Sequence, residues 1–187
     1  MIDWTTFQLF EPLWEAISAE HTIRSSPLRT PTVATVGPTV PHIRTMVLRE
    51  LNPYHLVFFT DRRSQKCTDI ALNPHTSVHC YFPSSKQQIQ LYGTMSMSII
   101  EPTSNMKRMM TSALRRPQDY ATFDPPGIEV STLESIHYDH SLAEQNFGLL
   151  VFDVTEIHLL TLGNPHHRCT WQRNMENNLW SKQWLVP

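Results

Sequence analysis

Cationic, hydroxyl and amide side chains alternate with apolar residues along one central part of the sequence. They are three fixed cations, two hydroxyls and two amides: Arg44, Arg49, Lys66, Thr60, Ser64, Gln65 and Gln88. Arginine offers phosphate oxygens a planar fork of donors, and lysine offers a compact point charge. A dianionic phosphate needs at least two such groups. The set is therefore suited to holding a phosphorylated, planar ligand that also forms hydrogen bonds.

Ser64 precedes a short helix that the sequence predicts over residues 64–72. Asn73-Pro74 ends this helix, because the residue before a proline is disfavoured in the α conformation. Ser64 can cap the helix, and Lys66 then lies in its first turn, where a cation opposes the helix dipole. An anion bound at the same place would resolve this conflict, since helix amides also bind phosphate.

Arg44 and Arg49 are five residues apart in one predicted strand, 42–49. Strict alternation in a strand places side chains at this spacing on opposite faces of the sheet. The two arginines are therefore expected to contact different groups, unless a bulge interrupts the strand.

The overall composition favours one domain over residues 1–187 and excludes several classes of protein. A net charge of −2 provides no basic field for nucleic acid or anionic lipid. No apolar run approaches the length of a membrane span, and residues 1–4 do not begin a signal peptide. Cys67, Cys80 and Cys169 show no paired spacing, which indicates buried thiols rather than a disulfide framework. We expect a cytoplasmic protein.

Short strands dominate the predicted secondary structure. Strands are expected at residues 32–36, 42–49, 55–60, 75–82, 87–100, 147–160 (as two strands or a bulged one), 167–173 and 179–186. Helices are expected at 5–20, within an N-terminal section 1–30, and at 64–72 and 103–114. The segment 115–146 has no periodicity, and a loop of this length often forms a lid or an interface. The few helices favour a mainly β barrel or sandwich over a doubly wound sheet.

Several of these segments resemble motifs of the pyridoxamine 5′-phosphate oxidase family. Arg44-Thr-Met-Val-Leu-Arg49 is similar to Arg-x-Val-Leu-Leu-Lys of that family, and Phe58-Phe59-Thr60-Asp61 is similar to its Phe-Tyr-Thr-Asn. Ser64-Gln65-Lys66 resembles its Ser-Arg-Lys, and Asn164-Pro-His166-His-Arg168 resembles its Arg-x-His-x-Arg. The resemblance extends from Pro31 almost to the end of the chain and is weakest in 115–146.

The resemblance implies an FMN-binding split β-barrel, Greek-key-like, with six to eight strands and a few flanking helices. It also implies a homodimer with two FMN molecules at the subunit interface. Arg44 and Lys66 would hold the flavin phosphate, with Thr60 and Gln65 nearby. Other positions that the resemblance assigns to the cofactor are Thr45, Met46, Val47, Leu48, Arg49, Phe59, Ser64, Gln88 and Arg168. Of these, Gln88 and Arg168 would reach the flavin from the partner subunit.

The substrate positions depart from the family pattern. The family holds a pyridoxal-type phosphate with Lys, Tyr, Arg and Ser, and the corresponding residues here are Arg49, Ser112, Arg116 and Tyr120. Arginine does not replace lysine conservatively at a tight phosphate site. The resemblance therefore implies FMN chemistry on a different small molecule, with Arg49, Arg116, His166 and Arg168 lining the substrate side.

Two functions remain open at this point. The first is an FMN-dependent oxidoreductase related to pyridoxamine 5′-phosphate oxidase, with no side chain identified as an obligatory acid or base. The second is a flavin-binding carrier or redox sensor without robust turnover. A metal site is not expected, because the histidines at 75 and 79 fall on a predicted strand without a cysteine or carboxylate to complete a ligand set.

Overall fold

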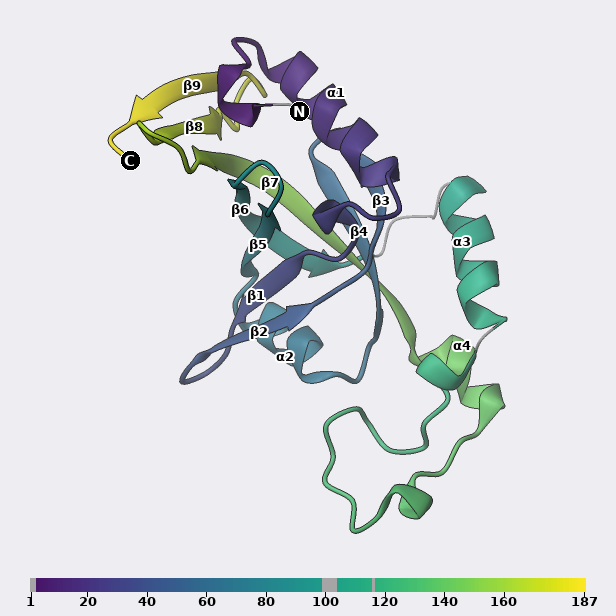
Figure 1. Ribbon diagram of the computed structural model, residues 1–187. Helices are drawn as coiled ribbons and strands as arrows, with labels where there is room; N and C mark the ends of the chain where they lie inside the picture. Colours follow the sequence, from purple (N-terminus) through teal and green to yellow (C-terminus); the bar gives the residue numbers. More distant parts are fainter. Residues whose placement is uncertain (1–2, 99–103, 116) are drawn as a thin grey trace.

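The computed structural model describes residues 3–98, 104–115 and 117–187 (Figure 1). Within these ranges the chain forms one nine-stranded antiparallel sheet with helices around it. The strands are β1 (Thr32–Val36), β2 (Pro41–Thr45), β3 (Leu48–Asn52), β4 (His55–Asp61), β5 (His75–Phe82), β6 (Gln87–Met97), β7 (Phe147–Thr161), β8 (His167–Arg173) and β9 (Trp180–Leu185). The helices are α1 (Phe10–Thr22), α2 (Gln65–Leu72), α3 (Ser104–Leu114) and α4 (Ala143–Asn146). The prediction of a mainly β fold is confirmed.

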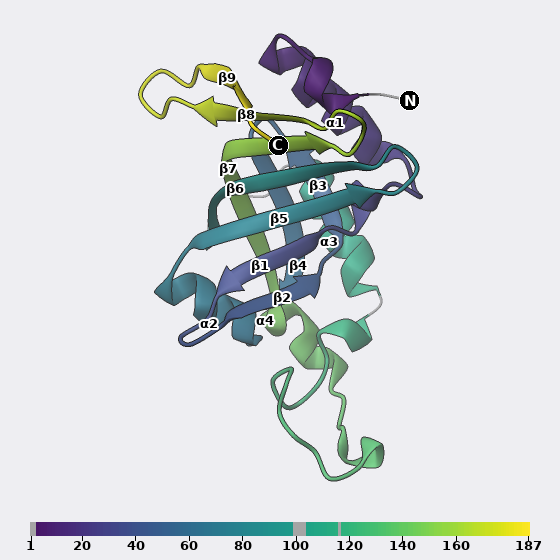
Figure 2. The same cartoon turned by 60° about the vertical axis from the view of Figure 1, so that its left-hand side comes forward.

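The sheet bends into two layers that share β7. Its strand order is β2-β1-β5-β6-β7-β4-β3, and β8 and β9 extend from β7. The N-terminal half of β7 pairs with β4, its C-terminal half pairs with β8, and β6 pairs along most of its length. Figure 2 shows β1, β5 and β6 in front of β4, with β7 turning from one layer into the other.

The register between β6 and β7 shifts at this bend: Tyr92 pairs with Glu156 and Gly93 with Val154, so Thr155 is an extra residue in β7. The prediction of a bulged strand over 147–160 is confirmed, and β7 remains a single strand. A Cβ atom on Gly93 would lie 1.9 Å from the carbonyl oxygen of Asp153, so only glycine allows this close approach.

The prediction of one strand over residues 42–49 is wrong. The chain pairs with β1 as far as Thr45 and then leaves that layer at Met46, whose amide donates to the carbonyl of Pro31. It joins β4 as β3 at Leu48, and a bulge follows between Leu48 and Glu50. With this division the described residues form nine strands, one more than the upper end of the predicted six to eight.

The N-terminal helix is shorter than predicted, because a separate 3₁₀ turn, Trp4–Thr6, precedes it and α1 begins at Phe10. Proline is tolerated in the first helical turn, where Pro12 lies. Phe10 stacks on Trp180 of β9 with ring centroids 4.0 Å apart. The buried face of α1, which contains Leu13, Trp14 and Ile17, closes one end of the core.

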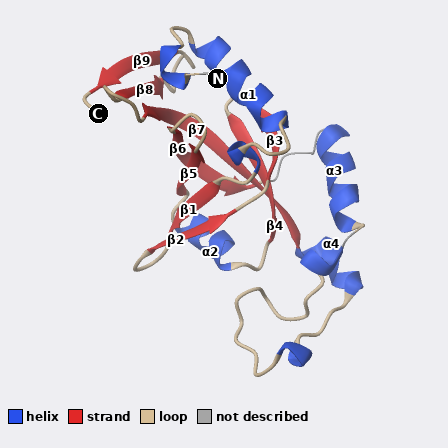
Figure 3. Cartoon of the chain, viewed as in Figure 1, coloured by secondary structure: helices blue, strands red, loops and turns tan. Residues whose placement is uncertain are grey.

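The segment from residue 117 to 146 contains short helical turns but little regular structure (Figure 3). It extends away from the sheet and returns through α4 to β7 (Figure 1). Its base packs in a small second core around Tyr120, Ala121, Ala143 and Phe147. The predicted strand residues 99 and 100, and residue 103 of the predicted helix, lie outside the described residues.

Candidate functional site

A pocket of about 340 Å³ opens where β2, β3, β4 and the start of α2 meet. It is lined by Arg44, Thr45, Met46, Val47, Arg49, Phe59, Thr60, Asp61, Ser64, Lys66, Asp119 and Pro126. Nine of these residues are among the predicted cofactor-binding positions. Six of them lie on β2, β3, β4 and α2, while Met46 and Val47 connect β2 to β3 and Ser64 precedes α2. The break between β2 and β3 brings Arg44 and Arg49 to the same pocket, whereas an unbroken strand would separate them.

Lys66 forms the centre of a hydroxyl-rich corner. Its Nζ donates to Ser64 Oγ at 2.8 Å and to Thr60 Oγ1 at 3.1 Å, and Ser64 Oγ donates to the carbonyl of Asp61 at 2.7 Å. Ser64 occupies the N-cap position of α2 as predicted, but its side chain does not bond to the helix amides. The serine therefore orients Lys66 instead of closing the end of the helix.

Arg44 lies beside this corner and also has a neutral partner. Its Nη1 donates to Thr35 Oγ1 at 2.8 Å, while the nearest carboxylate oxygen, on Asp69, is 3.8 Å from its Nη2. Burial lowers the pKa of Arg44 and that of Lys66, and the positive charge of Arg44 lowers the pKa of Lys66 further. Within the described ranges, no carboxylate forms a hydrogen bond or ion pair with Lys66, although the charges of Asp61 and Asp69 raise its pKa in part. Burial still leaves the pKa of both cations lowered, so a bound anion would stabilise their charged forms.

Arg49 supplies the third cation of the pocket. Its guanidinium lies 5.0 Å from the centre of the Phe59 ring, and its buried Nε atom has no hydrogen-bond partner among the described residues. A buried donor without a partner costs free energy, and a ligand acceptor would remove that cost.

The segment 115–146 forms one wall of the pocket through Asp119 and Pro126. Arg63 anchors this wall: Nε and Nη2 bind the Asp61 carboxylate at 3.0 and 2.7 Å. The same guanidinium donates to the backbone carbonyls of Thr122 and Phe123, both at 3.0 Å. The strand that provides Thr60 is thus connected directly to the long segment.

The remaining predicted site residues do not line this pocket. Leu48 is fully buried in the core, and the Gln65 side chain donates to Asp69. Gln88 lies on β6 and Arg168 on β8, where Arg168 approaches His158 of β7. His166 is exposed in the turn before β8, and its Nδ1 accepts a bond from the Gly163 amide. Arg116 lies outside the described residues.

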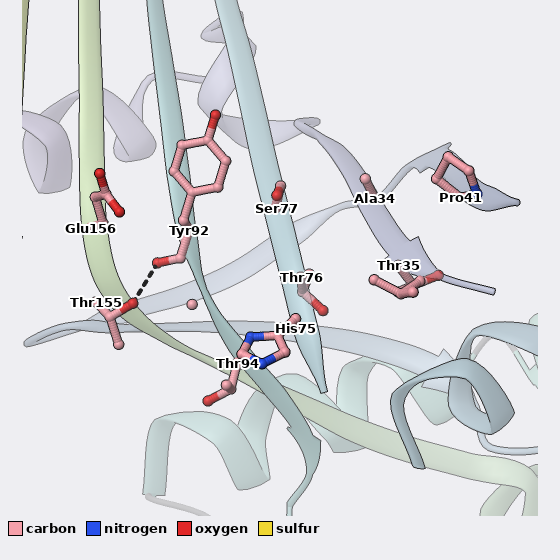
Figure 4. Close-up of a pocket in the computed structure, with 12 residues that line it drawn as sticks. Ala34, Thr35, Pro41, His75, Thr76, Ser77, Tyr92, Thr94, Thr155 and Glu156 are labelled. Atoms are coloured by element: carbon pink, nitrogen blue, oxygen red, sulfur yellow. Dashed lines mark hydrogen bonds between the residues drawn. The ribbon is translucent and has the colours of Figure 1, made fainter. Parts of the chain in front are cut away.

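A larger hollow of about 480 Å³ lies over β1, β5, β6 and β7 (Figure 4). Hydroxyl groups such as those of Ser77, Tyr92 and Thr94 line it, together with His75 and the carboxylate of Glu156. It contains no lysine or arginine, so it does not suit a phosphate. The described residues also contain no group of three side chains that could hold a metal ion.

The sequence prediction did not include Asp119 and Pro126 in the pocket wall, or the Thr35–Asp69 pair behind Arg44. Residues 35 and 69 are far apart in the chain, and their contact depends on α2 packing against β1. A weak signal existed in the i, i+4 spacing of Gln65 and Asp69, which hydrogen-bond on α2.

The family model and the curated relatives that match this chain are all described as pyridoxamine 5′-phosphate oxidases. Residues 10–99 match the family model described as pyridoxamine 5′-phosphate oxidase, FMN-binding domain. A pyridoxine/pyridoxamine 5′-phosphate oxidase from Mannheimia succiniciproducens is 39% identical over 62 residues, which is 33% of this chain and 29% of that protein. The enzyme of the same name from Chromohalobacter salexigens is 29% identical over 89 residues, covering 47% and 40%. These matches span less than half the length of either relative.

Solved structures match over nearly the whole chain. A pyridoxamine 5′-phosphate oxidase-related, FMN-binding protein from Nostoc punctiforme has a TM-score of 0.71 at 24% identity, covering 98% of this chain and 100% of that one. PhzG from Burkholderia lata, in complex with tetrahydrophenazine-1-carboxylic acid, has a TM-score of 0.70 at 16% identity, covering 95% and 90%. At these identities the likeness establishes the fold, a split β-barrel.

Proposed function

We propose that the chain is a member of the pyridoxamine 5′-phosphate oxidase-like family of FMN-binding split-barrel proteins and that it is an FMN-dependent oxidoreductase. Its substrate is a small molecule other than a pyridoxal-type phosphate, because the substrate positions depart from the family pattern. The observation that carries the proposal is the group of three cations, Arg44, Arg49 and Lys66, around one pocket. These cations lie beside neutral hydroxyls and an aromatic ring, so an anionic, planar cofactor fits the donors present.

The side chains at the two ends of the pocket have different roles in this proposal. Arg44 and Lys66 would hold the flavin phosphate, and Thr60 and Ser64 orient the ammonium group of Lys66. By the family resemblance, the backbone from Met46 to Leu48 would contact the flavin ring. FMN, when bound, supplies a ring that exchanges a hydride with the substrate, while the protein orients both. Arg49 lines the pocket on the proposed substrate side, and the resemblance assigns Arg116 and His166 to the same side.

We further propose that the functional form is a homodimer with the flavin at the interface. Gln88 and Arg168 do not line the pocket of their own chain, so a second copy is the source from which they would contact the flavin. None of the helices in the described ranges is long and apolar enough to cross a bilayer. Cys67, Cys80 and Cys169 are free and buried, which fits a reducing, cytoplasmic location.

A visible absorption spectrum of the purified protein, followed by heat release and mass identification of the chromophore, tests the cofactor. We expect an oxidised flavin spectrum and FMN at about one molecule per chain, as one pocket per chain implies. A colourless protein that does not quench the fluorescence of added FMN would contradict the proposal. Size-exclusion chromatography with light scattering tests the homodimer.

A flavin carrier or redox sensor without turnover is the second candidate, and one observation favours it. His166 is exposed and does not line the pocket of its own chain, so a single chain does not assemble the proposed substrate side. Anaerobic photoreduction followed by addition of oxygen and a panel of small oxidants and reductants separates the two functions. Repeated turnover supports the oxidoreductase, whereas tight FMN binding with no turnover supports the carrier.

A further inference from the structure

The hydroxyl group of Thr35 lies between Arg44 and a buried carboxylate. Thr35 Oγ1 accepts a bond from Arg44 Nη1 at 2.8 Å and donates to Asp69 Oδ2, also at 2.8 Å. The direct separation of Arg44 Nη2 from Asp69 Oδ2 is 3.8 Å, which is too long for a hydrogen bond. Arg44 and Asp69 therefore form an ion pair without a direct hydrogen bond, and one hydroxyl bridges the two groups.

Asp69 is held as a charged group in this position. It is fully buried on α2, and its carboxylate also accepts bonds from His42 Nδ1 at 2.8 Å and from Gln65 Nε2 at 3.1 Å. Burial alone raises the pKa of Asp69, but the bonds from His42, Gln65 and Thr35 outweigh it and hold that pKa below its usual value. A permanent negative charge thus lies directly behind the arginine of the pocket.

A direct ion pair would be the preferred arrangement without the intervening hydroxyl. Arginine and carboxylate groups form strong, bidentate pairs when they can approach. Arg44 paired in this way would turn toward Asp69, and its charge would be neutralised before a ligand arrived. The bond to Thr35 keeps the guanidinium on the pocket side, where it lies beside Lys66 and Ser64.

We propose that Thr35 is a positioning residue that sets the preference of this pocket for phosphorylated flavin over unphosphorylated flavin. This inference rests on the proposed function. Thr35 acts as a spacer: it prevents Asp69 from capturing Arg44 and leaves the guanidinium available to a phosphate. Riboflavin lacks the phosphate, so its binding does not depend on the spacer.

The test measures dissociation constants of FMN and riboflavin by quenching of flavin fluorescence, with the full chain stripped of cofactor. Thr35→Val keeps the shape and removes the hydroxyl, and we expect it to weaken FMN about tenfold or more, which corresponds to about 1.4 kcal/mol. The riboflavin constant is expected to change less than about twofold, a difference below roughly 0.4 kcal/mol. Thr35→Ser restores the hydroxyl and should restore FMN binding.

A second substitution tests the spacer directly. In Thr35→Val/Asp69→Asn the carboxylate that would capture Arg44 is gone, so FMN binding should recover toward the wild-type value although two residues are changed. The matched control is Thr76→Val, because Thr76 faces Thr35 across the β1–β5 pair, is also buried, and donates its hydroxyl to the Pro74 carbonyl. This control should leave the ratio of the two constants unchanged.

Three results would overturn the inference: equal weakening of FMN and riboflavin by Thr35→Val, no recovery in the double variant, or an equal change in the ratio with Thr76→Val. Circular dichroism and the melting temperature identify a variant that fails to fold, and Thr35→Ala, which also lacks the hydroxyl, then provides the same comparison. Failure of the proposed function is distinct, since the wild-type protein would then bind neither flavin.

Discussion

Arg173, at the end of β8, and Lys66, in the first turn of α2, are both partly buried cations in very different surroundings. Arg173 donates to the Asp153 carboxylate at 2.8 Å and to Asn178 at 2.7 Å, and its guanidinium lies 4.7 Å from the centre of the Tyr54 ring. Among the residues that the structure describes, Lys66 donates only to hydroxyls. The first cation is satisfied by its own chain and holds the β8–β9 hairpin against the sheet. The second is left with charge to share with a ligand.

The comparison of these two cations distinguishes a residue that stabilises the fold, Arg173, from one that is available to bind a ligand, Lys66. A cation with a full set of partners contributes to the free energy of unfolding, whereas a buried cation without a counter-ion costs free energy until an anion binds. Charge alone would not distinguish the two regions, because both contain arginine or lysine on neighbouring elements. The identity of the acceptor makes the difference.

Replacing Lys66 should have the largest effect on binding. For Lys66→Met we expect the FMN dissociation constant to rise by about 100-fold, because charge-assisted hydrogen bonds contribute about 1.5–3 kcal/mol each. The melting temperature of the cofactor-free protein should stay the same or rise, since a desolvated charge is removed. Fluorescence titration and thermal unfolding measure the two quantities. A protein that loses stability without losing FMN would reverse the assignment of this region.

Replacing Arg173 should have the opposite outcome. Arg173→Met removes a bond to Asp153 and the contact with Tyr54, and we expect a loss of about 1–2 kcal/mol in the free energy of unfolding. FMN binding should be unchanged within about twofold, a difference near 0.4 kcal/mol. Urea denaturation of the cofactor-free protein measures the free energy of unfolding, and flavin titration measures the FMN dissociation constant. The contrast would fail if this variant lost FMN as strongly as Lys66→Met.

We expect Lys66 to have a smaller effect on how the free energy of unfolding depends on pH than the two substitutions above have on binding and stability. Burial lowers the pKa of Lys66 in the folded state below its ordinary value of 10.5. The unfolded chain therefore binds more protons between these two values, and the contribution of Lys66 to stability increases as the pH rises toward 10.5. Urea denaturation of the cofactor-free wild type and of Lys66→Met across this window measures the difference. A wild type that loses stability relative to Lys66→Met as the pH rises would mean that the charged form is stabilised in the folded state.

Local sequence signals predicted much of the fold and part of the pocket. The Asn-Pro stop predicted the end of α2, and the apolar run before Thr60 predicted β4, because both signals act within a few residues. The division of 42–49 into β2 and β3 was not predictable in this way, since it follows from the pairing of Met46 with Pro31 and of Leu48 with Phe58. The path of 115–146 depends on Arg63, about 60 residues earlier in the chain, and a segment without periodicity does not indicate such a contact.

The sharing of β7 between the two layers has a consequence for the order of synthesis. Residues 147–153 complete the hydrogen bonding of β4, and residues 150–161 do the same for β6. Until a ribosome has released them, both of these earlier strands have an unpaired edge that can associate with other chains. The segment that carries Arg44 and Lys66 is thus made well before the strand that closes the sheet around it. Late synonymous codon changes or truncations near residue 147 should consequently affect the yield of folded protein more than changes of the same kind beyond β7.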